Sequence, residues 1–499
     1  MKNFIIPFNN TYELGKGLSS LTGEAKGSIF TGYELEENVA ATGQKVEASL
    51  IKIESSEKLY ESLNIDVELS ASYGLFSADA KFGFASDSNI NSHSIYYLYK
   101  VRVQNAVKRI KKLQFDPFAI QLLNDGKTEI FSRKYGDSFI EGIITGGEFF
   151  ALYELKCQDE SSKQKISAEL DASYGAFGMG GDLNVKFSSA VEKASKKSTL
   201  SINIFQTGGK GNAVVFNPNE IAERAKNFPS IVQGDAGVAY EIIRASYETL
   251  PLPDGPNFIE IENRKEALNA YAKDIIDLRK KQNDLKYILL NPWEFEYTGR
   301  TDNEVNAEDI NKISDCLQNI QLHIRAYTKH ASVCADSSAL CEQFVYKVNY
   351  DLSELPKRIQ RLTQVILFDE KNYTGKTYYL PKGEYPSLEQ FSSLTNDSIS
   401  SIKIPIGFKA ILCELPNGGG LKQIFDSSES DLSLRGLDNS VSSIVIFEDN
   451  ETVPPTLENP FPIKPIPPTS AEPLNKRHLL VKTIINKELL SRSFLKTHK

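Results

Sequence analysis

The segment ELSASYG at residues 68–74 returns as ELDASYG at residues 169–175, and this repeat governs how the rest of the chain is interpreted. Around each copy, apolar and polar residues alternate over a long run, residues 65–103 and residues 166–204, and the phase slips once at the same place. A polar stretch, residues 86–92 or 193–198, precedes a returning run. Alternation places apolar side chains on one face of a strand. The sequence therefore predicts two related β-hairpins with polar tips.

Two kinds of structure share this pattern. Alternating strands of about 9–11 residues can cross a bilayer as part of a barrel, whereas an ordinary half-buried antiparallel sheet has the same alternation. The length of both runs, their polar tips and the duplication favour membrane insertion. The side chains predicted to enter lipid are the large apolar ones of the two copies: Tyr73, Phe76, Phe82, Phe84, Tyr174, Phe177, Leu183 and Phe187.

Between the two copies, residues 135–139 read YGDSF and a pair of glycines follows at residues 146–147. This order resembles the signature of the membrane attack complex/perforin (MACPF) family, an aromatic-Gly-Thr/Ser-His-aromatic run followed by Gly-Gly. Asp137 and Ser138 depart from that pattern, and the matching residues are Tyr135, Gly136, Phe139, Gly146 and Gly147. The resemblance implies a bent sheet flanked by two helical clusters, each of which unfurls into a transmembrane hairpin as subunits assemble into a ring.

A second repeat lies nearer the C-terminal end, where residues 396–401 read NDSISS and residues 438–443 read DNSVSS. Together with the spacing of Phe368, Tyr373 and Gly375, these hexapeptides resemble the βγ-crystallin family, in which two Greek keys form a sandwich that binds calcium. Calcium prefers six to eight oxygen ligands. The resemblance implies up to two Ca²⁺ ions held by Asn396, Asp397, Ser398, Ser400, Asp438, Asn439, Ser440 and Ser442. The alternative is that these residues only form turns with their own backbone.

These patterns predict an α+β chain in four parts. Residues 1–300 are expected to form a MACPF-like pore-forming domain with a bent antiparallel sheet and two helical clusters, and residues 301–360 a helical linker. Residues 361–449 are expected to form an all-β double Greek-key sandwich. Residues 450–499 form a proline-rich tail. Its basic end is expected to be a solvated, disordered terminus, and the alternative is an amphipathic helix, for which its apolar residues are spaced.

Five cysteines in 499 residues argue against a disulfide framework. Cys316, Cys334 and Cys341 recur with two histidines at intervals of seven and four residues, and one interpretation of this spacing is a zinc site. They also continue the apolar stripe of the helix expected over residues 303–345. Residues seven apart on a helix are separated by about 10 Å. We therefore expect these cysteines to pack, without forming a zinc site or a disulfide.

Charge and motifs narrow the function. The net charge of -8 gives no general attraction to nucleic acid. We find no Ser-His-Asp spacing, zinc-protease motif or phosphate loop, so the chain is not expected to be an enzyme. The N-terminal residues do not resemble a secretory leader. Export is therefore expected without a recognisable signal peptide, followed by action at a target membrane, or else a cytoplasmic protein until release.

The sequence accordingly predicts a pore-forming toxin or effector that is a monomer in solution and a ring-shaped homo-oligomer on a lipid membrane. A calcium-binding C-terminal module would recognise a surface receptor or glycan, or stabilise the chain. One alternative is a non-lytic adhesion or binding protein that uses the same fold. Another is a calcium-dependent hydrolase, which would need a titrating group in a pocket.

Overall fold

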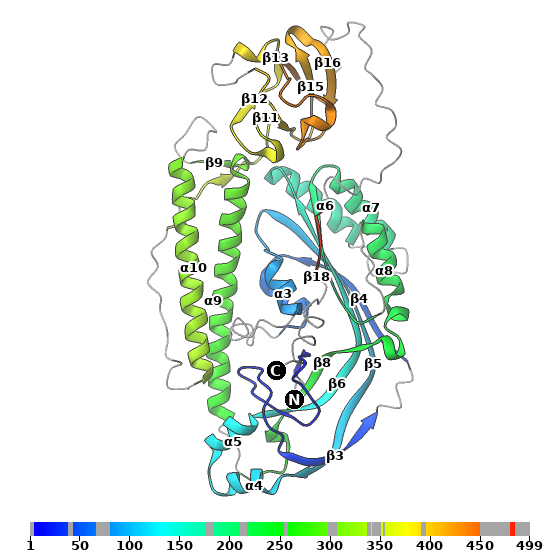
Figure 1. Ribbon diagram of the computed structural model, residues 1–499, viewed down its shortest axis with the longest axis vertical. Helices are drawn as coiled ribbons and strands as arrows, with labels where there is room; N and C mark the ends of the chain where they lie inside the picture. The colour runs from blue at the N-terminus through cyan, green and yellow to red at the C-terminus, as the bar shows by residue number, and fades with distance from the viewer. Residues whose placement is uncertain are drawn as a thin grey trace, which may run out of the picture.

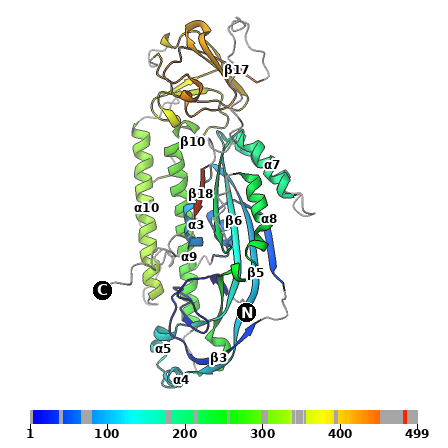
Figure 2. The ribbon, with the colours of Figure 1, turned by 45° about the vertical axis from the view of Figure 1, so that its right-hand side comes forward.

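The structure is a computed structural model that describes residues 4–37, 43–65, 80–174, 183–209, 217–253, 258–297, 307–336, 341, 351–352, 355–390, 396–449 and 480–484. It is a mixed α+β chain with several sheets (Figure 1). A long sheet occupies the centre, two long helices run along one side of it, and a small β-sandwich lies at one end (Figures 1 and 2).

The central sheet is built from nine described strands: β1 (Phe4–Pro7), β2 (Gly17–Leu18), β3 (Phe30–Glu37), β4 (Lys45–Ile53), β5 (Ser94–Phe115), β6 (Ser138–Lys156), β7 (Thr199–Thr207), β8 (Val238–Ser246) and β18 (Leu480–Ile484). The helices that cover or extend it are α1 (Ser56–Ser62), α3 (Ala80–Asp87), α4 (Pro117–Asn124), α5 (Thr128–Tyr135), α6 (Glu160–Tyr174), α7 (Leu183–Ser195) and α8 (Pro218–Ile231). Long β5 and β6 form its centre, paired antiparallel from Ser94 opposite Lys156 to Arg109 opposite Gly142.

The pairing of β5 with β6 is interrupted at the glycine pair. The register shifts between Gln104 and Val107, opposite this point in β6. Gly146 has a φ of 137°, and a Cβ on it would lie 1.9 Å from the carbonyl oxygen of Val103. A Cβ on Gly147 would lie 2.6 Å from a backbone oxygen of β7. Only residues without side chains allow three strands to approach this closely.

Both faces of the central sheet are buried where helices pack against β5 and β6. Successive side chains of these strands point to opposite faces, so each strand contributes to both cores. Tyr97 and Phe149 face one side, where they pack in one core with apolar residues of α6, α7 and α8. Tyr96 and Phe150 face the other side and pack with α1, α3 and α9 (Phe258–Leu290). The sheet is thus the middle layer of a three-layer arrangement.

The alternating runs form helices here as well as strands. In α6, Ile166 and Leu170 are buried, and in α7, Phe187 and Val191 are buried. Residues four apart lie on the same face of an α-helix and also on the same face of a β-strand. The same apolar residues can therefore serve either conformation, which is why alternation alone predicted strands.

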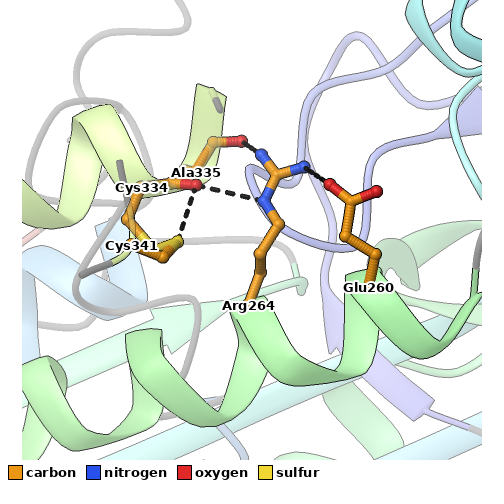
Figure 3. The surroundings of a disulfide bond; sticks show 5 residues. All are labelled: Glu260, Arg264, Cys334, Ala335 and Cys341. Atoms are coloured by element: carbon orange, nitrogen blue, oxygen red, sulfur yellow. Dashed lines mark hydrogen bonds and ion pairs between the residues drawn. A yellow bond between two sulfur atoms is a disulfide. The ribbon is translucent and has the colours of Figure 1, made fainter. Parts of the chain in front are cut away.

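The paired helices α9 and α10 (Ala307–Asp336) correct the cysteine prediction, because Cys334 and Cys341 form a disulfide with their Cα atoms 4.5 Å apart. The described part of α10 ends at Asp336, so helical spacing does not separate the two cysteines. Arg264 of α9 donates hydrogen bonds to the carbonyls of Cys334 and Ala335, which ties the end of α10 to α9 (Figure 3). No zinc-type group of side chains occurs in the described residues.

Strands between Val365 and Glu448 form a sandwich of two sheets, joined to α9 and α10 through the short pair β9 (Phe295–Glu296) and β10 (Lys357–Arg358). One sheet has the order β12-β11-β14 and the other β13-β17-β15-β16. Strand β13 precedes β14 in sequence but joins the second sheet, as in a Greek key. The strands are β11 (Val365–Phe368), β12 (Thr377–Leu380), β13 (Gly383–Tyr385), β14 (Ser401–Lys403), β15 (Phe408–Leu415), β16 (Gly419–Phe425) and β17 (Ser443–Glu448).

The described part of the basic tail differs from the helix suggested by its apolar spacing. Leu480–Ile484 form strand β18, which pairs parallel with β7 from Leu480 opposite Ser201 to Ile484 opposite Phe205. An edge strand offers unpaired amides and carbonyls, so a tail of suitable composition can add to it. None of the described helices has the length and apolar content needed to span a membrane.

The bend predicts the effect of filling the glycine site. We expect Gly146→Ala to lower the free energy of unfolding by at least about 2 kcal/mol, because the new Cβ meets the Val103 carbonyl at an unfavourable φ. Gly83→Ala in α3 is the control, since no atom lies within 4 Å of its Cβ position, and it should stabilise by about 0.5–1 kcal/mol. Urea unfolding followed by circular dichroism measures both. Equal midpoints for the two variants would contradict the close approach.

Candidate functional site

Both copies of the repeat lie in segments that join antiparallel neighbours at one end of the central sheet. The first insert (residues 54–93) connects β4 to β5, which pair there as Ile53 opposite Tyr96. The second insert (residues 157–198) connects β6 to β7, which pair as Lys156 opposite Thr199. Because β5 also pairs with β6, the order β4-β5-β6-β7 brings both inserts to the same end (Figure 1).

The polar stretches that were predicted to be hairpin tips lie next to the sheet in this structure. Residues 86–92 and 193–198, expected to be polar tips, lie just before β5 and β7 and therefore at the sheet end of each insert. The middle of the first insert falls near residue 74 and that of the second near residue 178. In sequence, the repeated Tyr-Gly pairs lie closer to the middle of each insert than the polar stretches do.

The residues predicted to enter lipid are buried where the structure describes them. Phe82 and Phe84 of α3 are 7% and 1% exposed, and Phe84 packs 5.8 Å from Phe205 of β7, ring centroid to centroid. Phe187 of α7 is 4% exposed and packs on Tyr97 at 5.4 Å. Tyr174 and Leu183 end and begin α6 and α7, with side chains outside the described part, and Tyr73, Phe76 and Phe177 lie outside the described residues. In this conformation the described apolar groups belong to the core.

A buried ion network, which sequence analysis did not identify, ties α3 to the bend. The Lys81 ammonium lies 2.6 Å from Glu148 and 3.5 Å from Glu241, and all three side chains are at most 3% exposed. Arg102 of β5 pairs with both carboxylates. Burial raises the pKa of Glu241, opposed chiefly by nearby Lys81. Removing one partner from such a network leaves an uncompensated buried charge, so α3 cannot leave the sheet without a change at the bend.

The signature-like segment fixes the start of β6. Gly136 ends α5 with a φ of 77°, and Phe139 stacks on Tyr247 with ring centroids 5.7 Å apart. The Tyr247 hydroxyl donates to the Tyr135 carbonyl at 3.0 Å. Asp137, which departs from the family pattern, accepts hydrogen bonds from the amide and hydroxyl of Ser20. These contacts give the segment a packing role at the end of the sheet remote from the inserts.

The two hexapeptides of the sandwich come together in crossed pairs. The Ser442 hydroxyl donates to Asp397 at 3.0 Å, and the Ser400 hydroxyl donates to Asn439 at 3.3 Å. Each pair joins one hexapeptide to the other, as the βγ-crystallin resemblance implies. Asp397 and Asn439 have φ values of 56° and 50°, a left-handed conformation that Asp and Asn adopt more readily than most residues.

The remaining candidate ligands belong to the same two hexapeptides and carry further oxygen atoms. The side-chain oxygens Oδ1 of Asn396, Oδ1 of Asp438 and Oγ of Ser440 are buried without a hydrogen-bond partner, and Ser398 lies beside Asp397 in the loop. Asp438 lies 3.6 Å from the Lys371 ammonium. Hard oxygens that lack donors fit a calcium ion. Among the described residues, three acidic, His or Cys side chains do not converge, so such sites would rely on amides, hydroxyls and carbonyls.

Fold and site together define a mixed α+β chain that contains a β-sandwich with candidate cation loops. Among solved structures, a βγ-crystallin domain from Flavobacterium johnsoniae is 33% identical, covering 18% of this chain and 98% of that domain, with a TM-score of 0.17. The N-terminal domain of protein S is 31% identical over 17% of this chain and 97% of that one, with a TM-score of 0.16. Stonustoxin is 10% identical over 67% of this chain and 42% of its own, with a TM-score of 0.38. No family model and no curated protein matches the chain.

If the crossed pairs hold calcium, neutralising Asp397 should affect calcium binding more than neutralising an acidic residue elsewhere in the sandwich. We expect Asp397→Asn to weaken Ca²⁺ binding at its site at least tenfold, because a carboxylate ligand becomes a neutral amide. The control is Asp426→Asn, an exposed acidic residue of the same sandwich. Calorimetric titration measures binding, and melting checks it, since calcium at 100 times its Kd should stabilise the wild type by about 2.7 kcal/mol. If both variants bind calcium as the wild type does, these loops are not the site.

Proposed function

We propose that this chain is a pore-forming protein of the MACPF type. It binds a target membrane, assembles into a ring of identical subunits and inserts two amphipathic β-hairpins from each subunit. The sandwich binds calcium, and it either recognises a surface receptor or glycan or stabilises the chain. A single observation carries this proposal: both inserts bridge the paired ends of adjacent antiparallel strands at one end of the sheet.

Such a placement makes unfurling a simple extension of existing pairing. If each insert straightens, β4 and β5 lengthen as one hairpin and β6 and β7 as another, without breaking any pairing among these strands. Each arm would contain about 20 residues, roughly 65 Å when extended. The hydrocarbon core of a bilayer is about 30 Å thick. The inserts are therefore long enough to cross it, and their alternation would give each arm one apolar face.

The disulfide supports action outside the producing cell. Disulfides persist in oxidising environments and are rare in the cytosol. Cys334 and Cys341 form a disulfide at the end of α10. The sandwich lies at the end of the sheet from which the hairpins would extend (Figures 1 and 2). A membrane-facing recognition module at that end would bring the inserts to the lipid surface. The proposal includes no enzymatic step.

A disulfide lock tests the role of the second insert. Glu192 of α7 accepts a hydrogen bond from Asn219 of α8 at 2.6 Å, and α8 lies outside the insert. We expect Glu192→Cys with Asn219→Cys to cross-link α7 to α8 under oxidising conditions and to abolish dye release from liposomes. Dithiothreitol should restore release to the level of equally treated wild type. The single variant Glu192→Cys controls for the substitution itself.

The same assay separates the alternatives. If the wild type binds vesicles of several compositions yet releases no dye, with and without calcium, the chain is a non-lytic binding protein. If the cross-linked variant releases dye as fast as its reduced form, the second insert does not unfurl. Either result would overturn the proposed mechanism.

A further inference from the structure

The pairing of β5 with β6 stops at an arginine from another part of the chain. The last pair is Ser94 opposite Lys156, so His93 opposite Cys157 would be the next in register. The Arg358 guanidinium donates hydrogen bonds to the carbonyl oxygens of both His93 and Cys157. In an antiparallel ladder every second facing pair exchanges backbone hydrogen bonds, so continued pairing requires the two chain segments to lie side by side. The guanidinium instead binds the carbonyls of both residues at the position where the pairing would continue.

The backbone amide of His93, just before β5, also has a partner outside the sheet. The His93 amide donates to the Asn91 side chain at 2.9 Å, and the His93 ring packs on Tyr287 and Phe295 with centroids 5.0 Å away. His93 is the last residue of the first insert and Cys157 is the first residue of the second. One arginine therefore contacts both inserts where they leave the sheet.

Arg358 is held in this position by buried partners. Its side chain is 6% exposed and lies 3.2 Å from the carboxylate of Glu294, which also accepts a hydrogen bond from the Tyr287 hydroxyl at 2.8 Å. Arg358 belongs to β10, which pairs with β9 beside Glu294. A planar guanidinium has five donors and can serve two carbonyls and a carboxylate together, which an ammonium cannot reproduce in the same geometry.

The residues after Arg358 continue the contact onto the start of α6. The amides of Glu160 and Ser161 donate to the carbonyls of Ile359 and Gln360 at 3.2 and 2.9 Å. These are amides of the first helical turn, which have no acceptor inside the helix. For β6 to extend into the second insert, these backbone bonds must break.

Asp159 closes the junction. Its carboxylate, 2% exposed, accepts from the amide of Ser162 at 2.7 Å and from the amide of Leu362 at 3.0 Å. Leu362 in turn packs with Phe368 of the sandwich in one buried cluster. The start of α6 is thus capped by Asp159, the residue before the helix, and by residues 359–362, which lead into the sandwich.

We propose that residues 358–362, the ladder stop, hold both inserts in their helical form until displacement of the sandwich withdraws Arg358. This inference rests on the proposed unfurling of the inserts. Withdrawal releases the backbone of His93 and Cys157 from Arg358, and the pairing of β5 with β6 then extends into both inserts. The ladder stop assigns to the sandwich a restraining role in addition to recognition.

Arg358→Lys tests the ladder stop while keeping the charge beside Glu294. Hydrogen exchange of the purified full chain, without membranes, should be at least tenfold faster at residues 157–162 than in the wild type. Dye release from liposomes should begin several-fold earlier. The matched control is Arg325→Lys, the same substitution at an exposed arginine of α10 outside the ladder stop, which should change neither quantity.

A second variant acts in the opposite direction. Ser161→Cys with Gln360→Cys, built with Cys157→Ser to remove a nearby thiol, places two thiols where a side-chain contact of 3.3 Å now exists. Its oxidised form should bind vesicles and release no dye, and reduction should restore release. Release by the oxidised form at the reduced rate would overturn the ladder stop.

The outcomes distinguish this inference from the proposed function. Unchanged exchange at residues 157–162 in a folded Arg358→Lys chain overturns the ladder stop, whatever the liposomes show. Faster exchange at residues 157–162 together with dye release at the wild-type rate overturns the claim that the ladder stop controls unfurling. Faster exchange in a chain whose wild type never releases dye supports the contact as a restraint and overturns the pore-forming proposal instead.

Discussion

The antiparallel pairing of β5 with β6 is the constraint on which the rest of the molecule depends. These strands pass the glycine pair together, and their side chains supply both buried faces of the sheet. The bend requires Gly146, because a side chain there would overlap the Val103 carbonyl. Because the strands continue on both sides of the bend, they carry the inserts at one end and the start of β6 at the other. Helices, ion network and sandwich are arranged around this pair.

Charge burial at the bend shows how the helical form of the first insert is fixed. Lys81 leaves α3 to meet Glu148 and Glu241 in a site that excludes water. An apolar contact would hold α3 through area alone, whereas this network holds it through a specific geometry whose disruption strands a charge. The second insert has no described counterpart at the bend. It is held mainly by apolar packing of α6 and α7 and by the contacts of residues 358–362.

The sequence allowed the α+β class, the glycine bend position and the pairing of the hexapeptides to be predicted, because each depends on local residue types or on a repeat. Helix over α6 could not be separated from strand, since Ile166 and Leu170 share a face in both. The polar stretch at residues 193–198 lies next to the sheet because β7 pairs with residues before the second insert, a long-range fact that alternation does not encode. The Cys334–Cys341 disulfide was excluded by assuming that α10 continues past Asp336. Arg358 and Lys81 looked like ordinary charged residues, and only tertiary contacts with distant chain segments reveal their roles.

The positions of the candidate cation loops and of the ladder stop connect the sandwich to the inserts. Ser400 belongs to a crossed pair, and three residues later Lys403 of β14 lies over the Trp293 ring at 4.4 Å and 3.8 Å from Glu294. Glu294 is the carboxylate that holds Arg358. Contact alone does not establish coupling; the element in between must have two arrangements that each site favours differently. Burial lowers the pKa of Lys403 to about 8, so the charge that it places beside Glu294 is retained at an energetic cost. A ligand that displaced β14 would disturb this contact, and through Glu294 it would act on Arg358.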